Sequence, residues 1–361
     1  MNARIDAVDA DLSWFSINAE AYNLGNADAD QLVPELGRRG LFRIGVPQAL
    51  GGDGGDTFDG VEAIAAIAER SLTAAFVCWG QRTFIEYLLQ SPNAALRERW
   101  LPALLAGEFA GATGLSNAMK FLSGIESLQL NATAKGERWQ LDGRLPWVTN
   151  LRKAGFIVAA AVARSDGAAP MVVAITDSES GVTRSADLDL VALRGSNTAA
   201  IDIRAADIGP EHVLHEDARS FCPGVRPAFL SLQLGMSIGL ARIALRTAAE
   251  QGKGAHAILL PRVGEVSAEL ERLVGAVREG LASGRFVSEP AALFRIRIRL
   301  AEIAQTALGL ELDASGGRAY LRDQHRDFAR RWVEGAFIPV ITPSLTQLQG
   351  ELARQAGACA A

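Results

Sequence analysis

Apolar residues at helical spacing dominate the first third of the chain. Segment 30–40 (DQLVPELGRRG) repeats apolar residues three or four positions apart and stops at a glycine. Segments 60–90 and 93–108 continue this spacing, and the first of them is rich in alanine. The pattern therefore predicts a helical N-terminal domain over residues 1–110.

The pattern changes near Gly111, where short β-forming runs replace the helical spacing. These runs are bounded by Gly, Asp, Asn and Pro, and they cover residues 127–151, 155–167, 169–177 and 198–208. No helical run separates them, which favours an antiparallel sheet or barrel over a strand–helix–strand unit. The sequence predicts a β-barrel-like middle domain over residues 111–215.

Helical spacing returns in the last third of the chain. Segment 226–251 is apolar nearly all round, which is typical of a helix buried in a bundle. Three further helices are predicted over residues 263–282, 290–314 and 325–337. The expected fold class is thus α+β multidomain, with a C-terminal four-helix bundle over residues 216–361.

Composition narrows the function classes. The chain has 361 residues and a net charge of -5, which argues against a nucleic-acid partner because such a partner requires a basic patch. No stretch reaches the eighteen or so uninterrupted apolar residues of a membrane span, and the acidic N-terminus resembles no signal peptide. Three cysteines lie far apart without a CxxC pair, so a reducing cytoplasm is expected.

A metal site is not expected. His212 and His215 lie close together in PEHVLHED, but no third ligand is near them in the sequence. A solvated pair of histidines is the favoured interpretation.

Five segments, in chain order, resemble the acyl-CoA dehydrogenase flavoprotein family. They are GLFRIGVPQALGG, LDGRLPWVTN, LRGSNTAAIDIRAADIGPEHVL, RPAFLSLQLGMSIGLA and ASGGRAY. The second is similar to the family's NG-K-WITN signature, and the last to its GG-GY turn. The resemblance implies a helical domain, a β-domain and a helical bundle, with FAD between the β-domain and the bundle.

The resemblance also assigns residues to the cofactor. In the WVT segment, Trp147 would cover the isoalloxazine ring and Thr149 would reach its polar edge, with Val148 between them. Gly316 and Gly317 of the GG-GY turn are further cofactor candidates. Without the resemblance, a core tryptophan beside a solvent-facing threonine is the alternative.

The family's TE–AGSD loop is replaced here by GATGLSNAMKFLSG. Alignment from the WVT segment makes Asn117 and Ser123 flavin-facing, with Ser116 as the substitute if the loop is offset by one residue. Leu115 adds a backbone N–H to this set, and Ser123 is also a substrate-binding candidate. The alternative is that the serines and the asparagine only form turns.

A second departure concerns assembly. Relatives carry an R—FG segment whose arginine reaches the FAD of a neighbouring subunit, whereas this chain has AAEQGKGAHAILLPR there. Lys253 or Arg262 could substitute, and solvated loop charges are the alternative. A homodimer or homotetramer built through the bundle is expected, since symmetric assemblies are common.

The third departure concerns the catalytic base. Acyl-CoA dehydrogenation needs a carboxylate to take the α-proton, and relatives supply it from a YEGT segment. Here Glu334-Gly335 is one residue early relative to Arg326-Asp327. Glu334 is the first candidate, and an i–4 pair with Arg330 on a helix face is the alternative.

Arg226 follows the position where some relatives hold their base. It could bind a CoA phosphate or carbonyl, or it could form an interdomain salt bridge.

These features predict a FAD-dependent oxidoreductase that catalyses α,β-dehydrogenation of an acyl-CoA or other acyl thioester. The resemblance implies an electron-transfer flavoprotein as electron acceptor. Two alternatives stay open: a two-component flavin-dependent monooxygenase on the same fold, and a non-catalytic family member.

Overall fold

The computed structural model describes residues 12–122, 126–321 and 326–360. Its N-terminal part is helical, as predicted. The helices are α2 (Ser13–Leu24), α3 (Leu32–Arg38), α4 (Thr57–Ala68), α5 (Leu72–Gln90) and α6 (Ala94–Ala106), with short 3₁₀ turns η1 (Ala29–Gln31) and η2 (Gln48–Leu50).

Two of these helices differ from the sequence expectation. The single helix expected over residues 60–90 is divided into α4 and α5. The Ser71 hydroxyl accepts a hydrogen bond from the Ala74 backbone N–H, and this N-cap starts the second helix. Helix α2 was not predicted.

The strands form one eight-stranded sheet in the middle of the chain. They are β1 (Ala110–Thr113), β2 (Leu130–Lys135), β3 (Arg138–Val148), β4 (Phe156–Arg164), β5 (Met171–Thr176), β6 (Val182–Asp187), β7 (Ala199–Ile208) and β8 (Val213–His215). The order is β6-β7-β3-β2-β4-β5-β8, and β1 pairs with β4. Most neighbours are antiparallel, as expected, but β4 is parallel to both β1 and β2. Strands β1 and β8 were missed because they are short, and β6 because its sequence, VTRSAD, is mostly polar.

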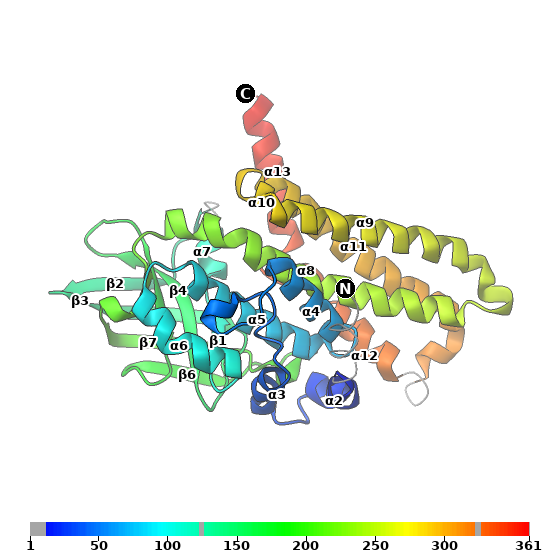
Figure 1. The fold of residues 1–361 in the computed structure, drawn as a ribbon, viewed down its shortest axis with the longest axis horizontal. Coiled ribbons are helices and arrows are strands. Elements are labelled where there is room, and N and C mark those ends of the chain that lie inside the picture. The colour runs from blue at the N-terminus through cyan, green and yellow to red at the C-terminus, as the bar shows by residue number, and fades with distance from the viewer. Residues whose placement is uncertain (1–11, 123–125, 322–325, 361) are drawn as a thin grey trace.

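The C-terminal part is a helical bundle with more members than predicted. It contains α8 (Ala218–Gln251), α9 (Leu260–Ala282), α10 (Arg285–Ser288), α11 (Pro290–Ser315), α12 (Arg326–Gly335) and α13 (Leu345–Ala360). Helix α8 extends from the sheet along the length of the bundle (Figure 1). The N-terminal helices α4 and α5 pack against it, so α8 joins the three parts of the molecule.

Helix α8 is buried because α4 crosses it at close range. A Cβ atom on Gly235 would lie 2.7 Å from the Val61 carbonyl oxygen, and one on Gly239 would lie 2.1 Å from that of Ala65. Only glycine permits this approach.

Among the described helices, α8 alone is long and apolar enough to cross a membrane, yet 89% of its most apolar window is buried within the protein. The apolar surface of α8 is therefore buried within its own protomer. It gives no independent argument for an oligomer, which stays a prediction.

Candidate functional site

The indole of Trp147 lies uncovered near the end of β3. Its side chain is 67% exposed, whereas Val148 and Thr149, which follow it, are buried. The alternative of a core tryptophan beside a solvent-facing threonine is therefore the reverse of what the structure shows. An exposed indole offers a flat apolar surface for a ring system.

The Thr149 hydroxyl belongs to a short chain of hydroxyl groups. Thr149 Oγ1 lies 2.8 Å from Thr198 Oγ1, which in turn lies 2.8 Å from Ser196 Oγ. All three residues are buried, and Thr149 keeps 7% exposure. The hydroxyl chain therefore begins two residues after the exposed Trp147 in the sequence.

One glutamine fixes the end of β3. The Gln81 amide on α5 donates to the carbonyl oxygens of Leu104 and Phe109, and its oxygen accepts from the Gly111 N–H and the Asn150 side-chain amide. Asn150 Nδ2 also donates to the Gly111 carbonyl, at 2.9 Å. Gln81 and Asn150 are completely buried. They join α5, β1 and the residue that follows Thr149, so the backbone that carries Trp147 and Thr149 is held in place.

The structure gives the loop residues that were predicted to contact flavin different environments. Leu115 is fully buried, and Ser116 begins α7 (Ser116–Leu122). Asn117 donates both amide hydrogens to Glu126 and to the Ser127 carbonyl, and its oxygen accepts from the Gln129 N–H. This is the turn-forming role given above as the alternative. Ser123 lies outside the described residues.

The two glycines assigned to the cofactor occupy a different part of the protomer. Gly316 and Gly317 start the 3₁₀ turn η6 (Gly316–Tyr320) after α11, at the end of the bundle farther from the sheet (Figure 1). Gly316 has φ +61° and lies against the His256 ring, which bonds the Asp313 carbonyl through Nδ1 at 3.0 Å. Within one protomer, these glycines and Trp147 do not form one site.

Arg226 is a cation without a carboxylate partner among the described residues. Its guanidinium lies over the Phe294 ring, 5.8 Å from the centroid, and its Nε is buried without a hydrogen bond. Burial lowers the pKa of Arg226 below its usual value. The interdomain salt bridge considered above is not observed.

Glu334 is completely buried and fully paired. Its Oε2 accepts from Arg330 Nη1 at 2.8 Å, and its Oε1 accepts from the Thr73 hydroxyl at 3.2 Å. Burial raises the pKa of the Glu334 carboxyl, and the Arg330 charge opposes that shift. The i–4 pair suggested by the sequence is therefore present, but it lies in the interior between α12 and α5.

Of the other candidates, Arg262 and the histidines have local partners. Arg262 pairs with Glu265 at 3.1 Å, and Lys253 precedes the 3₁₀ turn η5 (Gly254–Leu259). His212 accepts from the Gly209 N–H at Nδ1, and its Nε2 lies 3.1 Å from Glu179. No group of three or more His, Cys, Asp or Glu side chains suited to a metal occurs in the described part of the chain.

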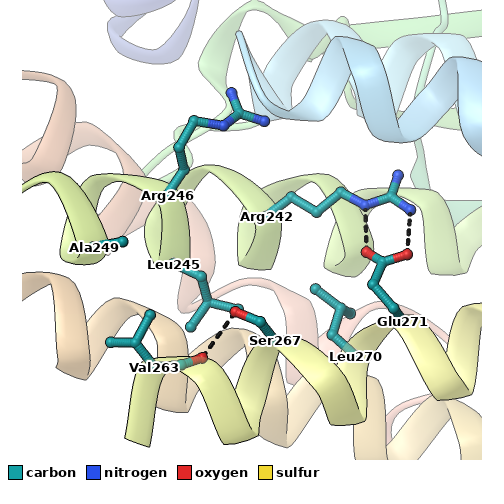
Figure 2. A pocket seen from close by; sticks show the side chains of 8 residues that line it. All are labelled: Arg242, Leu245, Arg246, Ala249, Val263, Ser267, Leu270 and Glu271. Atoms are coloured by element: carbon teal, nitrogen blue, oxygen red, sulfur yellow. Dashed lines mark hydrogen bonds and ion pairs between the residues drawn. The ribbon is translucent and has the colours of Figure 1, made fainter. Parts of the chain in front are cut away.

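A shallow groove of about 350 Å³ lies elsewhere, between α8 and α9 (Figure 2). Arg242 and Glu271 pair along it, with Nε and Oε1 3.0 Å apart, and Leu245 and Leu270 contribute apolar surface. None of the residues that the sequence assigned to a site lines this groove.

Sequence reasoning missed Gln81, Ser196 and Thr198. The RGSNT segment was noted as part of the resemblance, but its hydroxyl groups were given no role. Thr198 is 49 residues from Thr149, and only the pairing of β3 with β7 brings them together.

The comparisons with known proteins agree with this architecture. The acyl-CoA dehydrogenase N-terminal domain matches residues 16–108. Isovaleryl-CoA dehydrogenase from Pongo abelii is 29% identical over 192 residues, and the match covers 51% of this chain but only 44% of that protein.

Two solved structures share the fold over nearly the whole chain. Butyryl-CoA dehydrogenase from Megasphaera elsdenii superposes with a TM-score of 0.82 at 18% identity, covering 100% of this chain and 99% of that one. Dibenzothiophene monooxygenase from Paenibacillus gives 0.75 at 17% identity, covering 96% and 95%.

Fold and sequence together define an acyl-CoA dehydrogenase-type architecture. The partial sequence matches and the shared fold together support a divergent relationship to the acyl-CoA dehydrogenase family. They also support the flavin cofactor that the sequence predicted. The residues present fit such a group at Trp147, because its uncovered indole matches a flat ring, and Thr149 carries a hydroxyl two residues later in the sequence.

Proposed function

We propose that this protein is a flavin-dependent oxidoreductase that acts on an acyl-CoA or another acyl thioester by α,β-dehydrogenation. The observation that carries the proposal is the exposed indole of Trp147, in a segment that resembles the family's flavin signature and that also holds the buried Thr149. When bound, FAD supplies the acceptor for the hydride that leaves the substrate's β-carbon.

The protein's own residues bind and orient the ring. Trp147 would cover one face of the ring, and Thr149 would bond its edge. Gln81 and Asn150 hold the backbone beneath both residues, so their positions are set before the cofactor binds. Arg226, half-buried and without an acidic partner, is available to an anionic or carbonyl group of the substrate.

The α-proton base of this reaction is assigned to Glu334. Burial raises the pKa of Glu334, which makes its carboxylate a stronger base than an exposed glutamate. To act, the carboxylate must be reached by substrate, and this requires a rearrangement around Arg330 and Thr73.

The closed Glu334 network favours a second candidate. A flavin-dependent monooxygenase needs no carboxylate to remove an α-proton, and a dibenzothiophene monooxygenase shares this fold. A completely buried, paired Glu334 is compatible with that chemistry without rearrangement. A third candidate, a non-catalytic binding protein, rests on the missing R—FG segment.

An electron-transfer flavoprotein is the proposed electron acceptor, and a homodimer or homotetramer is the proposed assembly. A reducing cytoplasm stays a prediction from cysteine usage; Cys78 and Cys222 are free and buried.

Anaerobic titration of the flavin-loaded protein with acyl-CoA separates the candidates. The dehydrogenase predicts bleaching of the flavin by acyl-CoA alone. It also predicts that Glu334→Gln slows bleaching by about 10²–10⁴-fold in stopped flow, the usual worth of a positioned base. Bleaching of the variant at wild-type speed would remove Glu334 from the mechanism. Reduction only by an external reductase, followed by substrate-dependent oxygen uptake, would establish the monooxygenase, and protein that cannot bind flavin would establish the third candidate.

A further inference from the structure

Arg297 of α11 is a cation in the interior of the bundle, where it is 1% exposed. Its Nε donates to the Gln233 side-chain oxygen of α8 at 2.8 Å, and its Nη2 donates to the Ile338 carbonyl at 2.6 Å. Both acceptors are neutral, and the remaining nitrogen, Nη1, is buried without a hydrogen bond. Burial lowers the pKa of Arg297 to about 10, and no acidic side chain of the described residues opposes that shift.

Arg226 of α8 is a second cation without an acidic partner in the described part of the chain, and it lies close to the first. Its guanidinium lies over the Phe294 ring, and Phe294 precedes Arg297 by three residues, about one turn of α11. Helices α8 and α11 pack against each other. The contacts Arg226–Phe294 and Gln233–Arg297 therefore place both guanidinium groups between these two helices.

The two arginines lie at different depths. Arg226 is half-buried and makes no hydrogen bond or ion pair with a described residue, although its Nε is buried. Arg297 has almost no exposed surface of its own. A ligand that contacts both would therefore enter from the side of Arg226 and end at the free Nη1 of Arg297.

Two uncompensated cations favour an anion between them. A guanidinium in the interior is unfavourable without an opposite charge, and two of them on facing helices repel each other. An anion would offset both effects. A carboxylate suits this position better than a phosphate of the carrier, because it is planar, carries one charge and accepts from guanidinium N–H groups with both oxygens.

The arginines lie at a distance from the proposed base. On α11, Gln305 bonds the Gly335 carbonyl beside Glu334 at 2.8 Å. Arg297 lies eight residues before Gln305, about 12 Å along the helix axis. The backbone carbonyl that Arg297 holds belongs to the 3₁₀ turn η7 (Ile338–Val340), four residues after Glu334. A group bound by the arginines is therefore remote from an α-carbon that faces Glu334.

We propose that Arg226 and Arg297 form a carboxylate-binding subsite, and that the acyl group of the substrate carries a carboxylate at the end remote from the thioester. This proposal rests on the proposed function and names its substrate class. Arg297 Nη1 and the Arg226 guanidinium donate to the carboxylate oxygens, and Gln233 and the η7 carbonyl keep Arg297 oriented. Neither arginine exchanges a proton with the substrate, so both are binding residues.

The test compares the binding of two acyl-CoA esters to the FAD-loaded protein by calorimetry. Adipyl-CoA and hexanoyl-CoA have acyl chains of equal length, and one ends in a carboxylate where the other ends in a methyl group. We expect the wild type to bind adipyl-CoA about tenfold more tightly or better, the usual effect of a hydrogen bond to a charged group in a dry site.

Matched variants make the test specific. Arg297→Gln and Arg226→Gln should each remove the preference for adipyl-CoA and leave the affinity for hexanoyl-CoA unchanged. Arg295→Gln, at an exposed position of the same helix α11, is the control and should keep the preference. If Arg297→Gln does not fold, Arg226→Gln carries the test, because the half-buried Arg226 holds no described element through a hydrogen bond.

Three results would overturn the subsite. They are equal affinity of the wild type for the two esters, a preference that persists in Arg226→Gln, and equal weakening of both esters by that substitution. The last result, with competition by inorganic phosphate, would assign the arginines to a phosphate of the carrier. Flavin reduction by hexanoyl-CoA would leave the proposed function standing in each case. Wild-type protein that binds FAD but neither ester would overturn the proposed function as well.

Discussion

Arg330 and Glu334 form an ion pair in the interior, one turn apart on α12, with side-chain exposures of 5% and 0%. Asp327 contacts Arg330 at 3.2 Å from the exposed side, and Thr73 of α5 bonds Glu334 from the interior. The pair therefore joins the last part of the bundle to the N-terminal helices.

Removing one partner of the Arg330–Glu334 pair should lower the free energy of unfolding. Arg330→Met leaves the Glu334 carboxylate buried without its cation, and we expect a loss of about 3–5 kcal/mol in the free energy of unfolding. Denaturant unfolding monitored by circular dichroism measures this loss. The matched control is Arg285→Met, which breaks the Arg285–Glu289 pair at the same i, i+4 spacing but with both side chains more than half exposed. It should cost under about 1 kcal/mol.

The double variant Arg330→Met/Glu334→Gln should recover much of the loss, because no uncompensated charge stays in the interior. If the double variant is no more stable than Arg330→Met, or if the two single arginine variants lose equal stability, the Arg330–Glu334 pair is not a buried charge pair.

The raised pKa of Glu334 predicts the sign of a pH effect. Burial makes the folded protein hold the proton more tightly than the unfolded chain does, so ionisation costs stability. The difference in unfolding free energy between wild type and Glu334→Gln should therefore fall as pH rises from the ordinary glutamate range, about 4.5, through the raised folded pKa. Equilibrium unfolding of both proteins across this range measures the difference.

Glu269 provides the opposite control. The hydrogen bonds from Arg299 lower the pKa of the Glu269 carboxyl. The contribution of Glu269 to the free energy of unfolding is therefore present above the ordinary glutamate pKa and is lost as pH falls through the folded pKa. Glu269→Gln should give a difference that grows with pH. A Glu334 difference that also grows with pH would mean that Arg330, and not burial, dominates its titration.

The order of the three parts of the fold could be predicted because each has its own hydrophobic periodicity. Helical spacing marks α5, α8 and α11, and apolar runs mark β4 and β5. The break between α4 and α5 was missed because it depends on one serine cap inside a continuous apolar pattern. Strands β1 and β8 have only four and three residues, too few to show alternation, and β6 (VTRSAD) is mostly polar and has no buried position.

The candidate site was predictable only where it is local in sequence. Trp147 and Thr149 lie in one short segment, so a motif could identify them. Gln81, Thr198 and Asn150 meet through tertiary contacts between α5, β3 and β7, and spacing along the chain does not reveal such contacts. The burial of Glu334 could not be predicted from the sequence either, because it depends on how α12 packs against α5.

Gln81 should matter for both stability and cofactor binding. Gln81→Leu removes an amide that satisfies two carbonyls, one backbone N–H and the Asn150 side chain. Because buried groups are left unpaired, we expect a loss of about 2 kcal/mol or more in unfolding free energy, together with weaker flavin binding.

Gln140→Leu, on the more exposed start of β3, is the control for Gln81 and should change stability by under about 0.5 kcal/mol. Equal effects of the two substitutions would show that Gln81 does not hold the site.

The central claim is that Trp147 forms part of a flavin site, and flavin content tests it most directly. Wild type and Trp147→Ala are purified, equilibrated with FAD and compared by visible absorbance after removal of free cofactor. Trp332→Ala, which truncates a 46% exposed tryptophan on α12, is the control. We expect wild type and Trp332→Ala to retain flavin, and Trp147→Ala to bind it with an affinity reduced about fivefold or more, corresponding to about 1 kcal/mol for a lost aromatic contact. Unchanged flavin content and an unchanged spectrum in Trp147→Ala would contradict the account.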